Sequence, residues 1–391
     1  MVIRKGYKQT ELGIIPEDWE VVPLSSIASI ERGKFTHRPR NDPAFYGGKY
    51  PFIQTGDVES SNGKITKITQ TLNEKGLSVS KLFPKRIIVV TIAANIGSTA
   101  ITTFPVCFPD SLIGIIPNNM NTEFLEYFLR TKKGYLNKTA TNSAQKNINL
   151  ETLKPLLIIK PDNDEQQKIS STISDIEKLI HSLESLIQKK KNIKQGTMQE
   201  LLTGKRRLEG FSGEWEIKQL GKIINIEKGE QLNKSNLTLK DLYAVWNGGM
   251  EPSGFTNKYN QEENIITISE GGNSCGYVNF SFKKFWAGAH CYILNTPKPD
   301  LDKIFLFYAL KYSEKSIMKL RVGSGLPNIQ KKRISQFEIS LPPTKEEQEA
   351  ISKILSDMDS EIQQLENQLN KYINLKQAMM QKLLTGEIRL V

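Results

Sequence analysis

The chain is a single unit written twice in succession. Residues 165–204 align with residues 347–386 at a constant offset of 182, and Leu-Leu-Thr-Gly closes both segments. Ahead of them, Trp19-Glu-Val-Val-Pro-Leu is matched by Trp215-Glu-Ile-Lys-Gln-Leu at an offset of 196. The repeat therefore predicts two similar globular parts, each followed by a long helix. It also predicts a function that requires two copies of this unit.

Length agrees with two domains, because 391 residues exceed what one hydrophobic core usually serves. Short apolar strand candidates mixed with helices in each copy predict an α+β class. The repeat offsets set the domain boundaries. These are residues 1–160 for the first domain, 161–204 for a central helix, 205–343 for the second domain and 344–391 for a C-terminal helix.

The charge balance favours a polyanionic partner. Lys and Arg outnumber Asp and Glu by 53 to 42, which leaves a formal charge of +11 and a pI near 9.2. Nucleic acid and a membrane surface are the two alternatives. The start of the chain lacks a signal-peptide pattern, and its longest apolar stretch, residues 87–96, is far shorter than the ~18 residues of a spanning helix. We therefore expect a soluble, cytoplasmic protein with no membrane contact.

Apolar residues in both helical segments follow the 3.5-residue period of a coiled coil. Their spacing alternates between four and three residues, which keeps one seam of a helix facing a partner helix. The offset of 182 maps one seam onto the other. The seam residues are Ile169, Ile173, Ile176, Ile180, Leu183 and Ile187 in the first helix, and Ile351, Leu355, Met358, Ile362, Leu365, Leu369 and Tyr372 in the second.

The ends of the two helices also match. Asp162-x-x-Glu and Thr344-x-x-Glu are capping boxes, and Gly204 and Gly386 stand where a left-handed C-terminal cap belongs. Each helix then counts about 38 residues, which at 1.5 Å per residue is about 57 Å. A helix of that length suits a spacer.

The two helices are predicted to pair antiparallel. A whole domain, residues 205–343, lies between them, and a parallel pair would require that domain to return the chain along the full helix length. The alternative is two separate amphipathic helices, each lying on its own domain, but such helices usually show a wider apolar stripe. Antiparallel pairing relates the two copies by an approximate two-fold axis.

The globular parts share a frame but differ in their loops. Gly and Asn punctuate them, as in residues 46–48, 61–63, 246–249 and 270–273, which predicts surface loops. Two domains with the same framework and different loops suit two sites that bind different targets. The predicted strands are residues 87–91, 112–116, 156–159, 265–268, 290–294 and 337–341, with a single helix in each copy at 123–131 and 304–312.

Basic residues gather in the loops of both copies, beside aromatic, Asn and Gln residues. Lys and Arg contact phosphates, whereas Asn, Gln and Arg read base edges. For any one cluster a solvated surface is the alternative, but clusters occur in both copies just before each helix. The candidate DNA-binding residues are Lys34, Arg38, Arg40, Gln145, Lys146, Asn147, Lys283, Lys284, Asn328, Gln330, Lys331, Lys332 and Arg333.

No active site can be assembled from the sequence. Nucleotide-phosphate loops, dinucleotide fingerprints and the Asn/Asp-Pro-Pro-Tyr/Phe tetrapeptide of aminomethylating enzymes are absent. Cys107, Cys275 and Cys291 show no Cys-x-x-Cys spacing, so neither a disulfide framework nor a zinc site is indicated. His290 beside Cys291 could pair a base with a nucleophile, but neighbours in a strand point to opposite faces. We predict no catalytic and no metal-binding residue.

Over essentially its whole length, the chain resembles the specificity subunit of a type I restriction-modification system. The resemblance rests on the two domain–helix repeats, the Trp19 and Trp215 openings, residues 161–166 and 342–348 at the helix starts, and the two Leu-Leu-Thr-Gly endings. Each motif is weak alone, while their order and duplication are specific. One difference lies before each helix: residues 143–148 read Ser-Ala-Gln-Lys-Asn-Ile, and residues 323–329 read Gly-Ser-Gly-Leu-Pro-Asn-Ile.

The resemblance implies two target recognition domains, each reading one half of a split double-stranded DNA sequence and held apart by the helices. Two methyltransferase (M) subunits would dock on the helices, and restriction/translocase (R) subunits would join for cleavage. S-adenosylmethionine, ATP and Mg would act in those partners, in a prokaryotic cytoplasm. This chain would hold no cofactor and catalyse nothing.

Two other classes of protein remain as alternatives. A scaffold displaying two protein-binding domains would not bind DNA at moderate salt. A stand-alone nuclease or methyltransferase with a diverged site would act on DNA when supplied with Mg²⁺ or S-adenosylmethionine.

Overall fold

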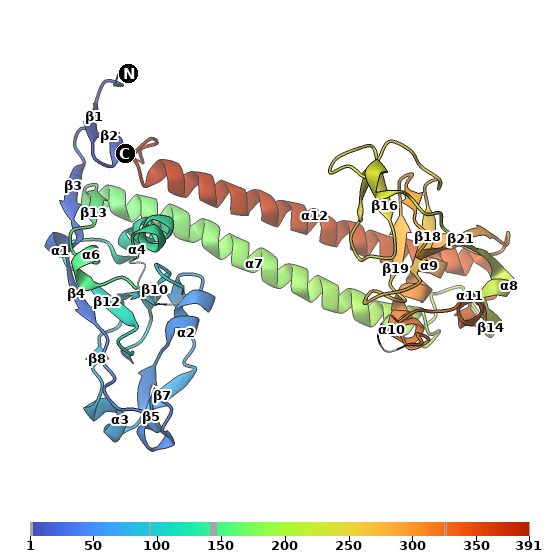
Figure 1. Ribbon diagram of the computed structural model, residues 1–391, viewed down its shortest axis with the longest axis horizontal. Helices are drawn as coiled ribbons and strands as arrows, with labels where there is room; N and C mark the ends of the chain where they lie inside the picture. Colours follow the sequence, from blue (N-terminus) through green and yellow to red (C-terminus); the bar gives the residue numbers. More distant parts are fainter. Residues whose placement is uncertain (1–2, 94, 141–146, 324, 326, 391) are drawn as a thin grey trace. The chain divides into compact units, whose positions relative to one another are not determined.

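The computed structural model describes residues 3–93, 95–140, 147–323, 325 and 327–390, and it divides into two compact units (Figure 1). Unit one comprises residues 1–182 and 369–391, and unit two comprises residues 183–368. Each unit holds one globular part and a segment of each long helix. The mixture of helices and strands confirms the predicted α+β class.

A five-stranded sheet forms the centre of unit one. Its strands, in spatial order, are β4 (Ala28–Arg32), β12 (Leu112–Pro117), β9 (Ile88–Thr91), β10 (Thr99–Thr102) and β6 (Lys64–Ile65). β12 is antiparallel to both of its neighbours, and Ile115 lies opposite Ile30 on one side and Ile88 on the other. All four residues of β9 are buried, as expected for an apolar strand covered on both faces.

A second, four-stranded sheet in unit one includes a segment that we expected to be a loop. Its strands, in spatial order, are β7 (Gln70–Leu72), β5 (Tyr46–Phe52), β11 (Val106–Cys107) and β8 (Leu82–Phe83). The loop prediction for residues 46–48 was wrong, because pairing with β7 stabilises this glycine-rich stretch. The register shifts between Tyr46 and Tyr50, which accommodates the glycines.

The remaining elements of unit one surround these sheets. β3 (Glu20–Pro23) pairs antiparallel with β13 (Leu157–Lys160), which leads directly into the first long helix. The prediction of a single helix was incomplete, because several short helices accompany the predicted one. The other elements are β1 (Tyr7–Thr10), β2 (Gly13–Pro16), α1 (Leu24–Ile27), a 3₁₀ turn at Pro43–Phe45, α2 (Thr55–Ser60), α3 (Glu74–Ser78), α4 (Thr122–Thr131), α5 (Lys133–Thr139) and α6 (Leu150–Leu153).

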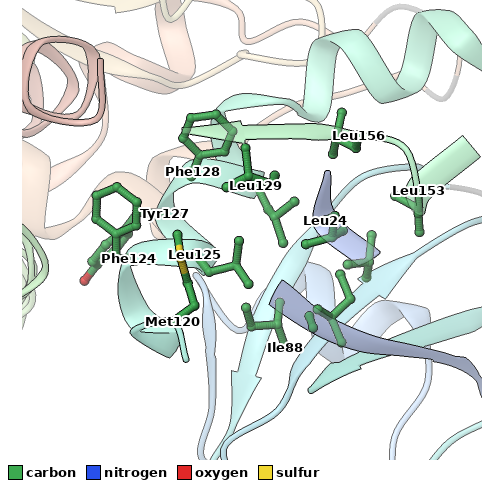
Figure 2. Close-up of a cluster of buried hydrophobic side chains, with 14 of the residues drawn as sticks. Leu24, Ile88, Met120, Phe124, Leu125, Tyr127, Phe128, Leu129, Leu153 and Leu156 are labelled. Atoms are coloured by element: carbon green, nitrogen blue, oxygen red, sulfur yellow. The ribbon is translucent and has the colours of Figure 1, made fainter. Parts of the chain in front are cut away.

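The main core of unit one lies between α4 and the five-stranded sheet. Asn121 caps α4 by accepting a hydrogen bond from the backbone N–H of Phe124 at 2.9 Å. Figure 2 shows the apolar side chains of α4 gathered beside Leu24 and Ile88, and all of them are buried. This non-polar packing holds α4 on the sheet.

Unit two repeats the two sheets of unit one in the same spatial order. The larger sheet runs β15 (Ile224–Lys228), β21 (Cys291–Pro297), β18 (Ile265–Ser269) and β19 (Val278–Ser281), and the smaller runs β17 (Gly254–Thr256), β16 (Tyr243–Trp246) and β20 (Trp286–Ala287). These strands correspond to β4, β12, β9 and β10, and to β7, β5 and β11. Within the described residues, β6 and β8 have no counterpart in unit two.

The other elements of unit two also follow the repeat. β14 (Glu216–Gln219) pairs antiparallel with β22 (Glu338–Leu341), as β3 pairs with β13. The predicted helix at 304–312 is α9 (Lys303–Tyr312), capped by Asp302. The remaining elements are α8 (Leu220–Ile223), a 3₁₀ turn at Lys234–Asn236, α10 (Glu314–Met318) and α11 (Lys331–Ser335).

The two long helices, α7 (Asn163–Leu201) and α12 (Lys345–Leu383), pair antiparallel, as predicted. In unit one, Lys376 of α12 lies 2.7 Å from Glu177 of α7. In unit two, Lys190 of α7 lies 2.6 Å from Glu361 of α12. The partner on α12 moves toward lower numbers as α7 advances, so the two helices run in opposite directions within each unit.

The helix caps follow the prediction only in part. Asp162 accepts a hydrogen bond from the backbone N–H of Glu165 at 2.8 Å, and Thr344 accepts one from Glu347 at 3.3 Å. The carboxylates of both Glu residues do not return to the capping residue, since each binds an arginine elsewhere. Gly204 adopts a left-handed backbone with φ of +68°, as a C-terminal cap requires.

The predicted seam residues are buried or half-buried throughout. The first two seam residues of each helix lie in a globular core, which the coiled-coil prediction did not anticipate. Ile169 and Ile173 belong to the main core of unit one, and Ile351 and Leu355 belong to the core of unit two. The beginning of each helix is thus part of a globular core, and in the second helix the next seam residue, Met358, also packs against that core. None of the helices in the described part of the chain is long and apolar enough to cross a lipid bilayer.

Candidate nucleic-acid interface

Three predicted basic residues of unit one lie in the exposed segment that follows β4. The backbone N–H of Lys34 donates to the Phe108 carbonyl at 2.9 Å, which ties the segment to the sheet. Arg38 donates to two backbone carbonyls, of which that of Phe35 is 2.7 Å away. Arg38 and Arg40 both pair with Asp110. One carboxylate therefore positions two guanidinium groups and leaves a net positive charge at this place.

A hollow of about 360 Å³ opens beside Arg40. Most of the side chains around it can donate or accept hydrogen bonds, and Tyr46 and Phe52 supply aromatic surface. Such a mixture is suited to the edges and faces of nucleic-acid bases. The lining residues are Arg40, Asn41, Tyr46, Phe52, Gln54, Thr55, Gln70, Ala93, Pro109 and Ser111.

Two glutamines of this hollow were not predicted from the sequence. The Gln54 amide donates to Oε1 of Gln70 at 2.9 Å, and the backbone N–H of Gln54 donates to Asp57 at 2.8 Å. Gln54 follows β5 and precedes α2, so the end of one element and the start of the next fix its backbone. Gln70 uses its side-chain oxygen in this bond, so its amide nitrogen could donate to a base edge, as glutamine does with adenine.

The differing loops before α7 and α12 are attached to their sheets in the same way. Asn147 forms a β-bridge with Ala93, and Asn328 forms one with Gly271. The next residue in each loop, Ile148 or Ile329, donates its backbone N–H to the carbonyl of Ile92 or Glu270. Gln145 and Lys146 lie outside the described residues. Since Ala93 also lines the hollow, the structure brings Asn147 beside the group that contains Arg40.

The predicted residues that follow Asn328 lie together at the start of α11. Gln330 is the residue that precedes this helix, and it is exposed together with Lys331, Lys332 and Arg333. Arg333 reaches the Leu320 carbonyl at 3.4 Å. Among the described residues, no acidic side chain pairs with these three cations, so their charges are available to a polyanion.

Lys283 and Lys284 lie elsewhere, in the turn between β19 and β20. Lys284 lies 2.8 Å from Glu262 and 4.4 Å from the centre of the Tyr259 ring. The hydrogen bond to Glu262 raises the pKa of Lys284 above its ordinary value. No hydrogen bond, ion pair or bridge between described residues joins this turn to α11. The structure therefore divides the predicted basic residues of unit two into two groups.

Glu270, the residue after β18 in unit two, corresponds to Ile92, the residue after β9 in unit one. The Glu270 side chain is 15% exposed. It accepts hydrogen bonds from Lys228 at 2.8 Å and from the Tyr292 hydroxyl at 3.2 Å, while His290 lies 3.6 Å away. A carboxylate can accept a hydrogen bond from an exocyclic amine of a base. Sequence reasoning missed Glu270 because a single acidic residue in a glycine-rich loop carries no distinguishing pattern.

Cys291 does not have the environment of a nucleophile. Its sulfur accepts a hydrogen bond from the backbone N–H of Gly248 at 3.0 Å and donates one to the Trp246 carbonyl at 3.1 Å. Burial raises the pKa of the Cys291 thiol to about 12, so the reactive thiolate is disfavoured. His290 lies outside the strand that was predicted to contain it, because β21 begins at Cys291, and its side chain is 61% exposed.

One group of carboxylates in the described residues has the geometry of a metal site: Asp18, Asp162 and Glu165. The guanidinium group of Arg389 already lies among them. It donates to both oxygens of Asp18 at 2.8 and 2.9 Å and to both oxygens of Glu165 at 2.7 and 2.8 Å. The positive charge required by this group thus comes from the chain itself.

Comparisons with known proteins assign both repeats to one family. Residues 16–195 and 212–375 both match the model of the type I restriction modification DNA specificity domain. The type I restriction enzyme MjaIX specificity subunit of Methanocaldococcus jannaschii is 25% identical and the alignment covers 98% of this chain and 96% of that one.

Solved structures share the fold. The crystal structure of the type I restriction-modification system S subunit from M. genitalium superposes with a TM-score of 0.68 at 19% identity, covering 98% of both chains. A structure described as showing complex assembly and conformational transition of the type I system gives a TM-score of 0.57 at 17% identity, covering 96% of this chain and 99% of that one. The two family matches, one on each repeat, place the chain in a family: it belongs to the DNA specificity subunits of type I restriction-modification systems.

Proposed function

We propose that the chain binds a bipartite DNA target, two short half-sites separated by a spacer that is not read, and that it has no catalytic activity of its own. The observation that carries this proposal is the pair of globular parts with one sheet order and different polar residues at equivalent places. Because the two globular parts share one sheet order, they would face DNA in similar ways. Because their polar side chains differ, they would select different bases.

In unit one, the hollow beside Arg40 would read the first half-site. Asn41, Gln54 and Gln70 would offer amide groups to base edges, and Arg40 can make the bidentate contact that guanine favours. Lys34 and Arg38 would contact phosphates nearby. Asn147 joins this group through its bridge to Ala93.

In unit two, the second half-site would be read near Glu270 and Asn328, which the bridge between Gly271 and Asn328 brings together. Lys331, Lys332 and Arg333 would contact phosphates, because they are exposed and have no acidic partner among the described residues. Gln330 precedes them at the start of α11. Lys283 and Lys284 would make a separate phosphate contact.

The helices α7 and α12 would determine the spacer length. Each has 39 residues, which at 1.5 Å per residue is about 58 Å. The domain boundaries that we propose remain residues 1–160, 161–204, 205–343 and 344–391.

The chain would act in the cytoplasm of a prokaryote within a larger complex. Two methyltransferase (M) subunits would dock on α7 and α12, and restriction/translocase (R) subunits would join them. S-adenosylmethionine, ATP and Mg would be bound by those partners. A solved structure of similar fold, described as showing complex assembly of the type I system, supports partner subunits in general.

The test is to express the chain together with its methyltransferase partner and to map modified adenines across a genome. We expect modification at a sequence of two short half-sites separated by a constant number of unread base pairs. Modification at one continuous motif, or at no defined motif, would contradict the proposal. The chain alone, supplied with S-adenosylmethionine or Mg²⁺, should leave DNA unchanged.

A further inference from the structure

A tyrosine of unit one connects the globular part to both long helices. The hydroxyl of Tyr127, on α4, donates a hydrogen bond to Oε2 of Glu177, on α7, at 2.9 Å. The other carboxylate oxygen of Glu177 lies 2.7 Å from the ammonium group of Lys376, on α12. Arg130, also on α4, donates to this second oxygen at 2.8 Å. Polar contacts thus run from the domain helix through one long helix to the other.

Unit two contains the same network with the two long helices exchanged. The hydroxyl of Tyr308, on α9, donates to Oδ2 of Asp359, on α12, at 2.8 Å. Lys194, on α7, pairs with the other oxygen of Asp359. We call each set, Tyr127–Glu177–Lys376 and Tyr308–Asp359–Lys194, a tyrosine network.

The repeat itself has kept a tyrosine, a carboxylate and a lysine. Tyr308 follows Tyr127 by 181 residues, Asp359 follows Glu177 by 182, and Lys376 follows Lys194 by 182. The loops of the two copies have diverged, yet a hydroxyl, an acid and an amine remain at matching places. Retention in both copies indicates a role that does not depend on which bases a domain reads.

The tyrosines of both networks are buried, and the network of unit one is the better shielded from water, because the Asp359 side chain of unit two is 45% exposed. Tyr127 and Tyr308 are each 4% exposed, and the side chains of Glu177 and Lys376 are 26% and 25% exposed. Burial raises the pKa of both tyrosines, so their hydroxyls remain protonated donors. For Glu177, burial acts to raise the pKa, but the charges of Arg130 and Lys376 outweigh it and lower the pKa. The acceptor therefore remains ionised.

The networks lie at a second level along the helices. The first level is the apolar core, where Ile169 of α7 packs with the globular part of unit one. Glu177 follows Ile173, the next seam residue in that core, by four residues, which is about 6 Å along the helix. A hydrogen bond adds a directional constraint on the angle, which non-directional apolar contacts do not supply.

We propose that the two tyrosine networks fix the angle at which each globular part stands on its helices, and that they thereby restrict the spacer length which the subunit accepts. Tyr127 and Tyr308 would act as positioning residues and would contact no DNA. The inference rests on the proposed bipartite recognition, because only a bipartite target has a spacer.

Substitutions Tyr127→Phe and Tyr308→Phe test this, since each removes one oxygen and leaves the apolar packing. The matched controls are Tyr135→Phe, beside α4, and Tyr312→Phe, on α9, whose side chains are exposed. Each variant is assembled with the methyltransferase partner and assayed on DNA carrying both half-sites with spacers of different lengths. The wild type should prefer one length.

For Tyr127→Phe and Tyr308→Phe we expect unchanged half-sites and a preference over the neighbouring spacer lengths that falls about tenfold, as loss of a hydrogen bond to a charged group allows. Lys376→Met, which leaves the Tyr127–Glu177 bond but cuts the contact with α12, should broaden the preference similarly. The controls should match the wild type.

Two results would overturn the inference: an unchanged spacer preference in both tyrosine variants, or methylation reduced equally at every spacer, which marks a purely structural role. Failure of bipartite recognition itself is distinguished, because the wild type would then show no spacer preference.

Discussion

At the residue scale, two arginines connect distant parts of the sequence in corresponding ways. Arg389 donates to Glu165, which also accepts a hydrogen bond from the Trp19 indole at 2.9 Å. In unit two, Arg207 donates to Glu347 at 2.6 and 2.7 Å. The sequence indicated both Glu residues as helix caps, because a local pattern cannot show an arginine that lies 224 residues away.

Replacement of Arg389 by Ala should destabilise unit one by about 3 kcal/mol, because it leaves the Glu165 carboxylate buried without a cation. The side chain of Glu165 is only 2% exposed. Glu387→Ala is the control, since Glu387 is exposed and, among the residues that the structure describes, pairs only with Lys382. Urea unfolding followed by tryptophan fluorescence measures the change; equal midpoints for the two variants would contradict the assignment.

Removing the charges of Lys331 and Lys332 should weaken binding to all DNA sequences alike. Each lost phosphate contact should reduce the slope of log affinity against log salt by about 0.9. Titrations of DNA at several salt concentrations provide the measurement, with Lys353→Ala as a control because Lys353 is exposed on α12 and pairs with Asp357. An effect at one base position only would show that these lysines read sequence instead.

The stability contribution of Glu177 should depend on pH. Its pKa is lowered in the folded chain, so the contribution is complete above the unfolded pKa of about 4.3 and is lost as pH falls below it. Glu177→Gln should therefore be less stable than the wild type at pH 7, by about 2 kcal/mol, with a smaller difference at pH 3.5. Unfolding at both pH values tests this, and a difference that grew on acidification would contradict it.

At the scale of elements, the sequence predicted those whose own residues dictate their structure. The apolar runs of β9, β12 and β18 and the 3.5-residue period of α7 and α12 were sufficient. β5 was missed because its glycines and lysine carry no apolar alternation, and its strand depends on partners distant in sequence. Likewise the hollow could not be predicted, since Arg40, Gln54 and Ala93 meet only after the sheets form.

Pairing of the helices should depend on the buried seam and not on nearby exposed leucines. Leu183 is 7% exposed and Leu186 is 39% exposed. Leu183→Asp should cost about 3 kcal/mol or more, because it buries a charge, whereas Leu186→Asp should cost far less. Thermal unfolding followed by circular dichroism compares the variants; similar losses in both would contradict the assignment of the seam.

At the scale of the whole molecule, the repeat gives the chain two similar globular parts. Both family matches fall on repeat units, and each unit combines the same sheet order with different polar side chains. The sequence could predict the two domains and the paired helices because these follow from duplication and periodicity. It could not predict Glu270 as a candidate, because its relation to Ile92 depends on the equivalence of β18 and β9.

The most direct test of the account lengthens the helices. Seven residues are inserted in α7 beside Lys191 and seven in α12 beside Glu366, which form a pair, so that the heptad pattern is kept. Each insertion adds about 10.5 Å, which corresponds to about three base pairs of DNA. Methylation mapping with the methyltransferase partner should show the same two half-sites with a spacer longer by about three base pairs. Changed half-sites, or the original spacer, would contradict the account.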